Sequence, residues 1–296
     1  MKAIIKPNGR GSYEASFLTR ASTLATAAIP WRPVTCAAVL LMVLALAPTA
    51  DGGVTRDAEG WTDVTPAADS REIYVSAAGN DANDGSFAAP KRTLNGGYAL
   101  LRTGMPDQLK LRRGDTWNET PPPWLKSGRS ATEPMLFGAY SDGTSGHLDS
   151  SPRPIVNSGT GLNNNASFQL MNGSGVTRID FVTIQSIEFR SSVSGAYGIW
   201  WYIISSNITI EDCYFSGFCQ AISAVNNVGE NRFATNCTIR RNVFAYNDMN
   251  VVHPQAMYIS NYAGTWEIDE NIFVENGVPT VRSHQVYIDD CRTTGL

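Results

Sequence analysis

The side chains of this sequence that could transfer a proton or hold a charged group gather near its carboxyl end, between positions 253 and 290. A histidine or tyrosine can act as base or acid, and an arginine can neutralise a substrate carboxylate. The candidates are His253, Tyr258, Arg282, His284 and Tyr287. A shift of 29 residues places His253 over Arg282, Gln255 over His284 and Tyr258 over Tyr287. These residues therefore form a catalytic cluster only if the chain repeats with this period; otherwise the tyrosines are repeat positions and the histidines bond to turns.

Two carboxylates follow this cluster directly. Asp289 and Asp290 are adjacent, and paired carboxylates can share acid and base work in an inverting hydrolase. In the 29-residue register they replace Ser260 and Asn261, so the alternative is that they are turn residues.

A strand with large aromatic side chains on both faces lies at Ile199–Tyr202, with the sequence IWWY. One face can join the core, and the other would expose Trp or Tyr, as in platforms that stack on sugar rings. Trp200 and Trp201 are the candidate substrate-binding residues, unless a neighbouring loop covers them.

A repeat sets the positions of all these candidates. Four segments, at 182–189, 208–215, 237–244 and 266–273, each end in Phe and carry Ile five residues earlier, with Phe-to-Phe steps of 26, 29 and 29 residues. Alternation and β-branched residues favour strands, and a period of this length predicts a solenoid. A parallel β-helix fits best, with inward columns of Ile and Phe and an amide ladder starting at Asn242 and Asn271. The predicted columns are Ile184, Ile210, Ile239 and Ile268, and Phe189, Phe215, Phe244 and Phe273.

The segment before the repeats predicts a cap for this sheet. A strand at Ile73–Val75, a short helix at Thr93–Arg102 and a strand through Leu109 and Leu111 follow in order. Asp81–Gly85 (DANDG) has the oxygen-rich composition of a calcium loop but lacks the distal Glu, so an Asx-rich turn is the alternative. No cofactor is predicted with certainty, and calcium is the one that the sequence suggests.

The first 50 residues are typical of an export signal. Five basic residues and one acid precede an apolar run, Cys36–Ala47, which is too short to span a bilayer and is followed by small residues. We expect cleavage near Ala50, with an uncleaved anchor or an upstream start codon as alternatives.

Charge and cysteine content narrow the partners of the mature chain. Removing residues 1–50 takes away five of 23 basic residues and one of 27 acidic ones, which leaves a net charge of −8. Such a chain predicts no nucleic-acid partner and no membrane insertion. Four cysteines remain, at 213, 219, 237 and 291, which fit no zinc spacing and allow three disulfide pairings or a buried apolar role.

The rungs, together with YVSAAGNDANDG, APKRTLNGGYALL and GDTWNE, resemble secreted right-handed parallel β-helix proteins of the pectin-lyase-like superfamily, from Glu72 to the end. The resemblance implies lyases, hydrolases or epimerases that act on acidic sugar chains. Lysine is a frequent lyase base there, but no Lys follows Lys126, so a base would come from the late cluster. YIDDC at 287–291 resembles the Asp-Asp-Cys segment of polygalacturonase-type hydrolases, whose companion motifs do not occur in this sequence.

The sequence thus predicts an all-β chain with a signal (1–50), a linker (51–71) and a right-handed parallel β-helix domain (72–296). The domain divides into a cap at 72–120 and clear repeats at 176–296, with an incomplete carboxyl end. The expected function is binding or degradation of extracellular polysaccharide, by a secreted or cell-surface protein, and the alternative is a non-catalytic adhesion or carbohydrate-binding module. The oligomeric state does not follow from the sequence.

Overall fold

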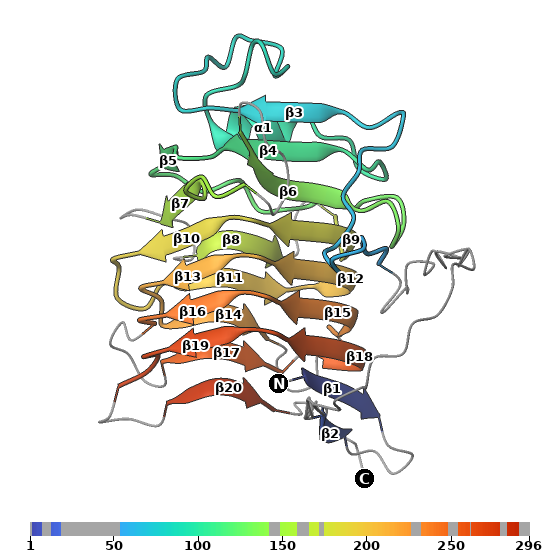
Figure 1. The fold of residues 1–296 in the computed structure, drawn as a ribbon, viewed down its shortest axis with the longest axis vertical. Helices are drawn as coiled ribbons and strands as arrows, with labels where there is room; N and C mark the ends of the chain where they lie inside the picture. Colours follow the sequence, from blue (N-terminus) through green and yellow to red (C-terminus); the bar gives the residue numbers. More distant parts are fainter. Residues whose placement is uncertain are drawn as a thin grey trace, which may run out of the picture.

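The computed structural model describes residues 54–141, 149–158, 166–171, 175–225, 232–247, 254–260, 262–278 and 283–289, and the backbone of 2–7 and 13–18. Its strands form an all-β parallel solenoid of about five turns, with almost no helix (Figure 1). The predicted fold class is confirmed, since each turn from β6 to β20 contributes one strand to each of three sheets.

The three sheets run along the axis of the solenoid. The nine-stranded sheet has the order β2-β1-β18-β15-β12-β9-β6-β4-β3, with strands Tyr13–Leu18, Lys2–Pro7, Tyr262–Asp269, Ala234–Arg240, Ile204–Glu211, Arg178–Gln185, Met135–Tyr140, Gln108–Arg112 and Glu72–Val75. The six-stranded sheet has the order β19-β16-β13-β10-β7-β5, with strands Ile272–Val274, Val243–Ala245, Tyr214–Ser216, Glu188–Ser191, Ile155–Ser158 and Thr116–Trp117. The five-stranded sheet has the order β20-β17-β14-β11-β8, with strands His284–Ile288, Gln255–Ile259, Gln220–Ala224, Tyr197–Tyr202 and Ala166–Met171.

The register confirms the predicted columns. Ile184, Ile210, Ile239 and Ile268 pair from β9 to β18. The four Phe residues pair from β10 to β19, and their rings stack with centroids 5.1, 5.1 and 5.2 Å apart. Alternation places Ile and Phe inside because successive strand residues point to opposite faces.

The first corner, between the nine- and six-stranded sheets, explains the predicted amide ladder. One residue in each rung takes a left-handed conformation there: Ser186, Asp212, Arg241 and Glu270, with φ between 54° and 61°. The next residue points inward. In the later rungs this residue is Asn242 and then Asn271, and Asn242 Nδ2 donates to Asn271 Oδ1 at 3.0 Å.

The second corner, between the six- and five-stranded sheets, carries a ladder that the repeat pattern did not reveal. Gly217, Tyr246 and Glu275 take the left-handed conformation, and Asn247 and Asn276 follow the last two. Asn247 Nδ2 donates to Asn276 Oδ1 at 2.7 Å, and Asn247 Oδ1 accepts from the Phe218 amide at 3.2 Å. Each ladder thus satisfies backbone groups that a turn leaves open.

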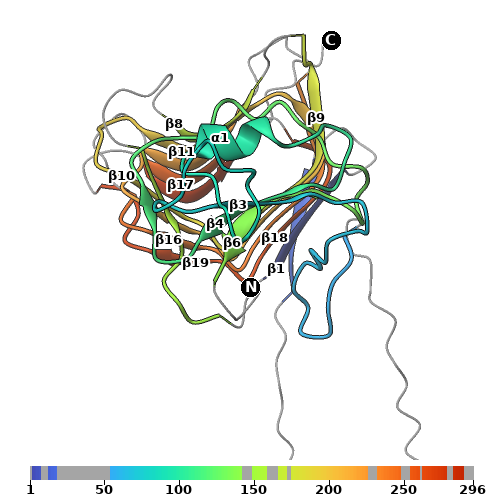
Figure 2. The same ribbon diagram turned by 90° about the horizontal axis from the view of Figure 1, so that it is seen from above.

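The cap closes one end of the core. Helix α1, Leu94–Ala99, starts at the N-cap Thr93, whose hydroxyl accepts from the Gly96 amide at 2.9 Å, and it lies over the end of the solenoid (Figure 2). A Cβ at Gly97 would lie 2.6 Å from the side chains of Val75 and Leu109, so glycine allows the helix to approach the core. The predicted strand, helix and strand are confirmed.

At the opposite end, β1 pairs antiparallel with β18 and with β2 (Figure 1). These two strands fall in the segment expected to be an export signal, and export stays a prediction. Within the described ranges, no helix is long and apolar enough to cross a bilayer. Cys213, Cys219 and Cys237 are free and buried, and burial raises the pKa of the Cys213 thiol to about 12, while Cys291 lies outside the described residues.

Candidate functional site

The predicted late cluster lies on strands β17 and β20 of the five-stranded sheet. Gln255 pairs with His284 and Tyr258 with Tyr287, as the 29-residue shift requires. The ring of Tyr287 lies 5.5 Å from that of Tyr258 and 5.2 Å from that of His284. His284 and Tyr287 are exposed, and Tyr258 is half-buried.

Three of the remaining predicted residues have no described geometry. His253, Arg282 and Asp290 lie outside the described residues. Asp289 is half-buried, and its amide donates to the Ile259 carbonyl at 3.0 Å. The base, neutraliser and acid roles assigned to these residues therefore remain predictions.

The two tryptophans of β11 face opposite sides. Trp201 is fully buried, its Nε1 donates to Ser205 Oγ at 2.8 Å, and its ring stacks on Trp266 at 5.2 Å. Trp201 is thus a core residue that no substrate can reach. Trp200 is half-buried on the outer face, 5.6 Å from the ring of Tyr197.

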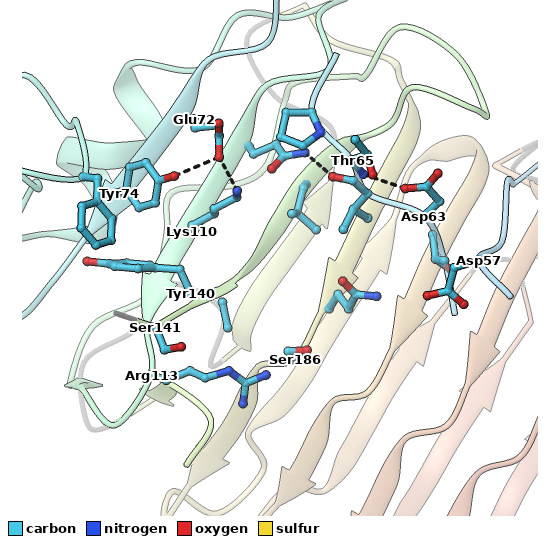
Figure 3. Close-up of a pocket in the computed structure, with 18 residues that line it drawn as sticks. Asp57, Asp63, Thr65, Glu72, Tyr74, Lys110, Arg113, Tyr140, Ser141 and Ser186 are labelled. Atoms are coloured by element: carbon cyan, nitrogen blue, oxygen red, sulfur yellow. Dashed lines mark hydrogen bonds and ion pairs between the residues drawn. The ribbon is translucent and has the colours of Figure 1, made fainter. Parts of the chain in front are cut away.

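A groove of about 530 Å³ lies elsewhere, on the outer face of the nine-stranded sheet beside the cap (Figure 3). Its floor comes from β3, β4, β6 and β9, and one wall comes from residues 57 and 62–66. We call residues 54–66 the strap; they fall in the stretch expected to be a linker. This groove brings together charged and aromatic side chains from several strands.

Strand alternation places the charged groups on the groove floor. Ile73, Leu109 and Leu111 are buried, so their neighbours Glu72 and Lys110 point outward. Lys110 Nζ lies 2.5 Å from Glu72 Oε2, and the Tyr74 hydroxyl donates to the same oxygen at 2.9 Å.

These contacts set the pKa values of Tyr74 and Glu72. Burial raises the pKa of Tyr74 to about 12, and its hydrogen bond to the Glu72 carboxylate acts in the same direction. Partial burial works to raise the pKa of Glu72, but the hydrogen bonds from Lys110 and Tyr74 outweigh it and leave that pKa lowered. At neutral pH, Glu72 is therefore ionised and Tyr74 is a neutral hydrogen-bond donor.

Three aromatic rings form one side of the groove. The ring of Tyr74 lies 5.4 Å from that of Phe87 and 4.9 Å from that of Tyr140, in edge-to-face geometry. Tyr140 is buried, whereas Phe87 is 53% exposed. The Phe87 side chain is thus open to solvent while two neighbouring rings fix its position.

Arg113, which lies next to Ser141 at one end of the groove (Figure 3), belongs to a second ion pair. Arg113 Nε lies 3.3 Å from Asp149 Oδ2, and Arg113 Nη1 donates to the Ser151 carbonyl at 3.0 Å. Burial lowers the pKa of Arg113, while hydrogen bonds from Ser141 and Ser151, with the charge of Arg113, lower the pKa of Asp149 to about 2. Both partners are charged at neutral pH.

Together these groups favour binding over proton transfer. Tyr74 is too weak an acid to serve as a base near neutrality, and Lys110 and Arg113 are each held by a carboxylate. An exposed aromatic ring next to fixed donors and acceptors is the arrangement that binds a sugar, because the ring covers the apolar face and the polar groups bond to hydroxyls.

The DANDG segment forms turns. Asn80 Oδ1 accepts from the Ala82 amide at 3.0 Å, and Asp84 Oδ1 accepts from the Ser86 amide at 2.9 Å. Asp81 accepts from the Arg92 and Thr93 amides, each at 2.9 Å, ahead of α1. In the part of the chain that the structure describes, no group of three or more His, Cys, Asp or Glu side chains could hold a metal ion.

Sequence reasoning did not find the groove. The outward polar residues that alternate with Ile73, Leu109 and Leu111 point to this surface, but the pattern of these strands predicts only a cap for the sheet. The strap that forms a wall is polar and has no periodicity, so nothing in the sequence placed it on the sheet.

Comparisons with known proteins give no family. No family model matches the chain, and no curated protein matches it. Among solved structures, a GH136 lacto-N-biosidase from Eubacterium ramulus aligns with a TM-score of 0.40 at 16% identity, over 75% of this chain and 41% of that one. A rhamnogalacturonan lyase aligns with a TM-score of 0.39 at 15% identity, over 73% of this chain and 67% of that one. The chain thus spans about two fifths of the lacto-N-biosidase, and similarity at this level carries no information about activity.

Proposed function

We propose that this protein binds a polysaccharide outside the cell, and that the groove on the nine-stranded sheet is its binding site. The observation that carries the proposal is the exposed ring of Phe87, held by Tyr74 and Tyr140 beside the Lys110–Glu72 pair. A planar aromatic face next to fixed hydrogen-bonding groups matches the two surfaces of a pyranose ring. A polymer, rather than a free sugar, suits a groove that is open along a sheet.

The charges in the groove favour a neutral chain over a polyuronate. The charged residues that line it are Asp57, Asp63, Glu72, Lys110 and Arg113. Lys110 pairs with Glu72 and Arg113 with Asp149, so neither cation offers surplus positive charge to a substrate carboxylate. This narrows the expectation from acidic glycans to neutral ones.

The test is binding of the full chain to cellohexaose, xylohexaose, mannohexaose and a galacturonate hexamer, measured by calorimetry. We expect binding to at least one neutral hexamer, tighter than to the galacturonate. Phe87→Ala should weaken it at least about tenfold, the loss expected when an aromatic anchor worth more than about 1.4 kcal/mol is removed. Tyr246→Ala is the matched control, since Tyr246 is 52% exposed and lies at a corner outside the groove. Absence of binding to every hexamer, or equal loss in both variants, would overturn the proposal.

A second candidate function is cleavage of a sugar chain at a separate site, on β17 and β20 of the five-stranded sheet. It is favoured by the register that brings His284, Tyr258 and Tyr287 together. Cleavage would be detected by incubating the protein with the same sugars and measuring unsaturated products and new reducing ends. Activity that persists in a His284→Ala, Tyr287→Phe double variant would exclude these residues from the chemistry.

Export is part of the proposal. The basic segment and the apolar run Cys36–Ala47 support removal of about 50 residues during secretion. The mature chain would then begin next to the strap. The amino-terminal sequence of the secreted protein tests this: a start near Asp51 supports cleavage, and retention of residues 2–18, which include β1 and β2, contradicts it.

A further inference from the structure

The strap crosses several rungs of the nine-stranded sheet on its outer face. The Val64 carbonyl accepts from Gln108 Nε2 on β4 at 2.6 Å, and the Thr62 amide donates to Glu211 Oε2 on β12 at 2.9 Å. Arg56 Nη2 lies 2.6 Å from Glu267 Oε2 on β18. The strap therefore runs along the solenoid axis, from the groove toward the last rung.

The side chains beneath the strap form one polar row. Gln185, Glu211 and Arg240 pair in register on β9, β12 and β15 and point outward. Gln185 Nε2 donates to Glu211 Oε2 at 3.1 Å, and Glu211 Oε1 lies 3.2 Å from Arg240 Nε. Gln185 also lines the groove, so the row and the groove are continuous.

The strap does not supply a hydrogen-bond partner for every buried polar atom of this row. Glu211 is fully buried and Arg240 is 3% exposed. Arg240 Nη1 is buried without a hydrogen-bond partner among the described residues. Buried polar atoms are normally hydrogen-bonded, so this covered surface has bonding capacity that the strap does not use.

Few apolar contacts hold the strap against the sheet. Val54 is its buried hydrophobic residue, and Trp61 is half-buried. The Arg241 guanidinium lies 4.2 Å from the centre of the Trp61 ring, and its Nη2 donates to the Glu59 carbonyl at 3.3 Å. Hydrogen bonds and cation–π contacts of this kind exchange readily for those of a polar ligand.

We propose that the strap is a displaceable cover, and that the binding groove continues beneath it over Gln185, Glu211 and Arg240. This inference rests on the proposed function and extends the same site. Strands are spaced by about 4.8 Å, so the two steps from β9 to β15 lengthen the groove by roughly 10 Å. A short oligosaccharide fills the open groove alone, whereas a longer neutral chain displaces the strap and bonds to the row with its hydroxyls.

Hydrogen exchange on the full chain tests this directly. The Thr62 amide bonds across the contact between the strap and the sheet, to Glu211 Oε2 at 2.9 Å, so its exchange reports displacement of the strap. Cellohexaose, xylohexaose or mannohexaose, whichever binds, should speed exchange at this amide, and the matching disaccharide should leave it unchanged. Both sugars should slow exchange around Phe87.

A variant that loosens the strap gives the second measurement. Trp61→Ala removes the contact with Arg241, worth about 0.5–1 kcal/mol at an exposed site. It should tighten hexamer binding about two- to fivefold and leave disaccharide binding unchanged. Glu59→Ala is the matched control, because Arg241 reaches the backbone of Glu59 and not its exposed side chain.

The possible outcomes separate the two proposals. If no neutral hexamer binds, the proposed function fails. If a hexamer binds at Phe87 but slows exchange in the strap, or if Trp61→Ala does not favour the hexamer over the disaccharide, the strap is a fixed wall and the inference fails.

Discussion

The late rungs, from β12 to β19, and the early region, from the strap to β6, share one sheet geometry and use it differently. In the late rungs the same residue types recur at the same positions, so Ile, Phe and Asn stack on copies of themselves. In the early region the outward positions change from rung to rung, from Tyr74 to Lys110 to Gly138. Repetition therefore builds the scaffold, and the break in repetition supplies different side chains to one groove. The comparison predicts that changes in the inward columns of the late rungs affect stability, whereas changes at the outward positions that line the groove in the early region affect binding.

The largest effect should come from the stacked phenylalanines. Phe215→Ala removes a fully buried ring that lies 5.1 Å from both Phe189 and Phe244, and should lower the free energy of unfolding by about 3–5 kcal/mol. Phe87→Ala, in the early region, should cost about 1 kcal/mol or less because that ring is half-exposed. Urea denaturation measures both, and equal losses would break the comparison.

The next effect concerns the second corner. Gly217 and Gly104 have nearly the same φ, 78° and 75°, but a Cβ at Gly217 would lie 1.9 Å from the Ser191 carbonyl oxygen, whereas one at Gly104 meets nothing within 4 Å. Gly104→Ala should cost about 1–2 kcal/mol for its left-handed backbone alone. Gly217→Ala should cost about 1–3 kcal/mol more, because the backbone must move. Thermal unfolding of the two variants separates conformational strain from steric overlap.

A smaller effect should follow from the amide ladder. Asn247→Ala leaves the Phe215 carbonyl and the Phe218 amide without their side-chain partner in a buried site, at a cost of about 1–3 kcal/mol. Asn157→Ala, on β7 and outside the late rungs, removes an exposed amide pair with Asn118 and should change stability by less than about 0.5 kcal/mol. If the two variants unfold at the same urea concentration, the ladder contributes nothing beyond its surface counterpart.

The last prediction concerns acid sensitivity of the cap. Asp107 is fully buried; burial works to raise its pKa, but hydrogen bonds from Arg102 and from the Arg71 amide leave it lowered. A lowered folded-state pKa means that the carboxylate stabilises the fold above its unfolded value of about 3.9, and that this contribution disappears as pH falls further. The stability difference between the wild type and Asp107→Asn should therefore shrink below about pH 4. A stability difference that is independent of pH would contradict the assignment.

Much of the fold was predictable because it depends on local rules. Alternation at Ile73, Leu109 and Leu111 indicated the cap strands, and the Phe steps of 26 and 29 residues fixed the register of the late rungs. The pairing of Gln255 with His284 followed from the same period. The ladder at Asn247 and Asn276 does not follow from the repeat pattern. Its corner is occupied by Gly217 in one rung and by Tyr246 and Glu275 in the next two, so no residue type recurs there in all three.

The candidate site was less predictable because it joins segments that share no pattern. Residue type alone makes both Trp200 and Trp201 candidates, but strand alternation places Trp200 on the outer face and Trp201 in the core. Lys110 and Glu72 are 38 positions apart and meet because β3 and β4 pair in parallel.

The sequence by itself determined the period, the inward columns and the strand type, because apolar side chains at fixed spacing can be buried in one way when each rung lies on the last. The tertiary structure decided which outward residues become a site. The strap has no periodicity, and its place on the nine-stranded sheet depends on contacts with Gln108, Glu211 and Glu267, residues that are distant in sequence and converge only once the solenoid has formed.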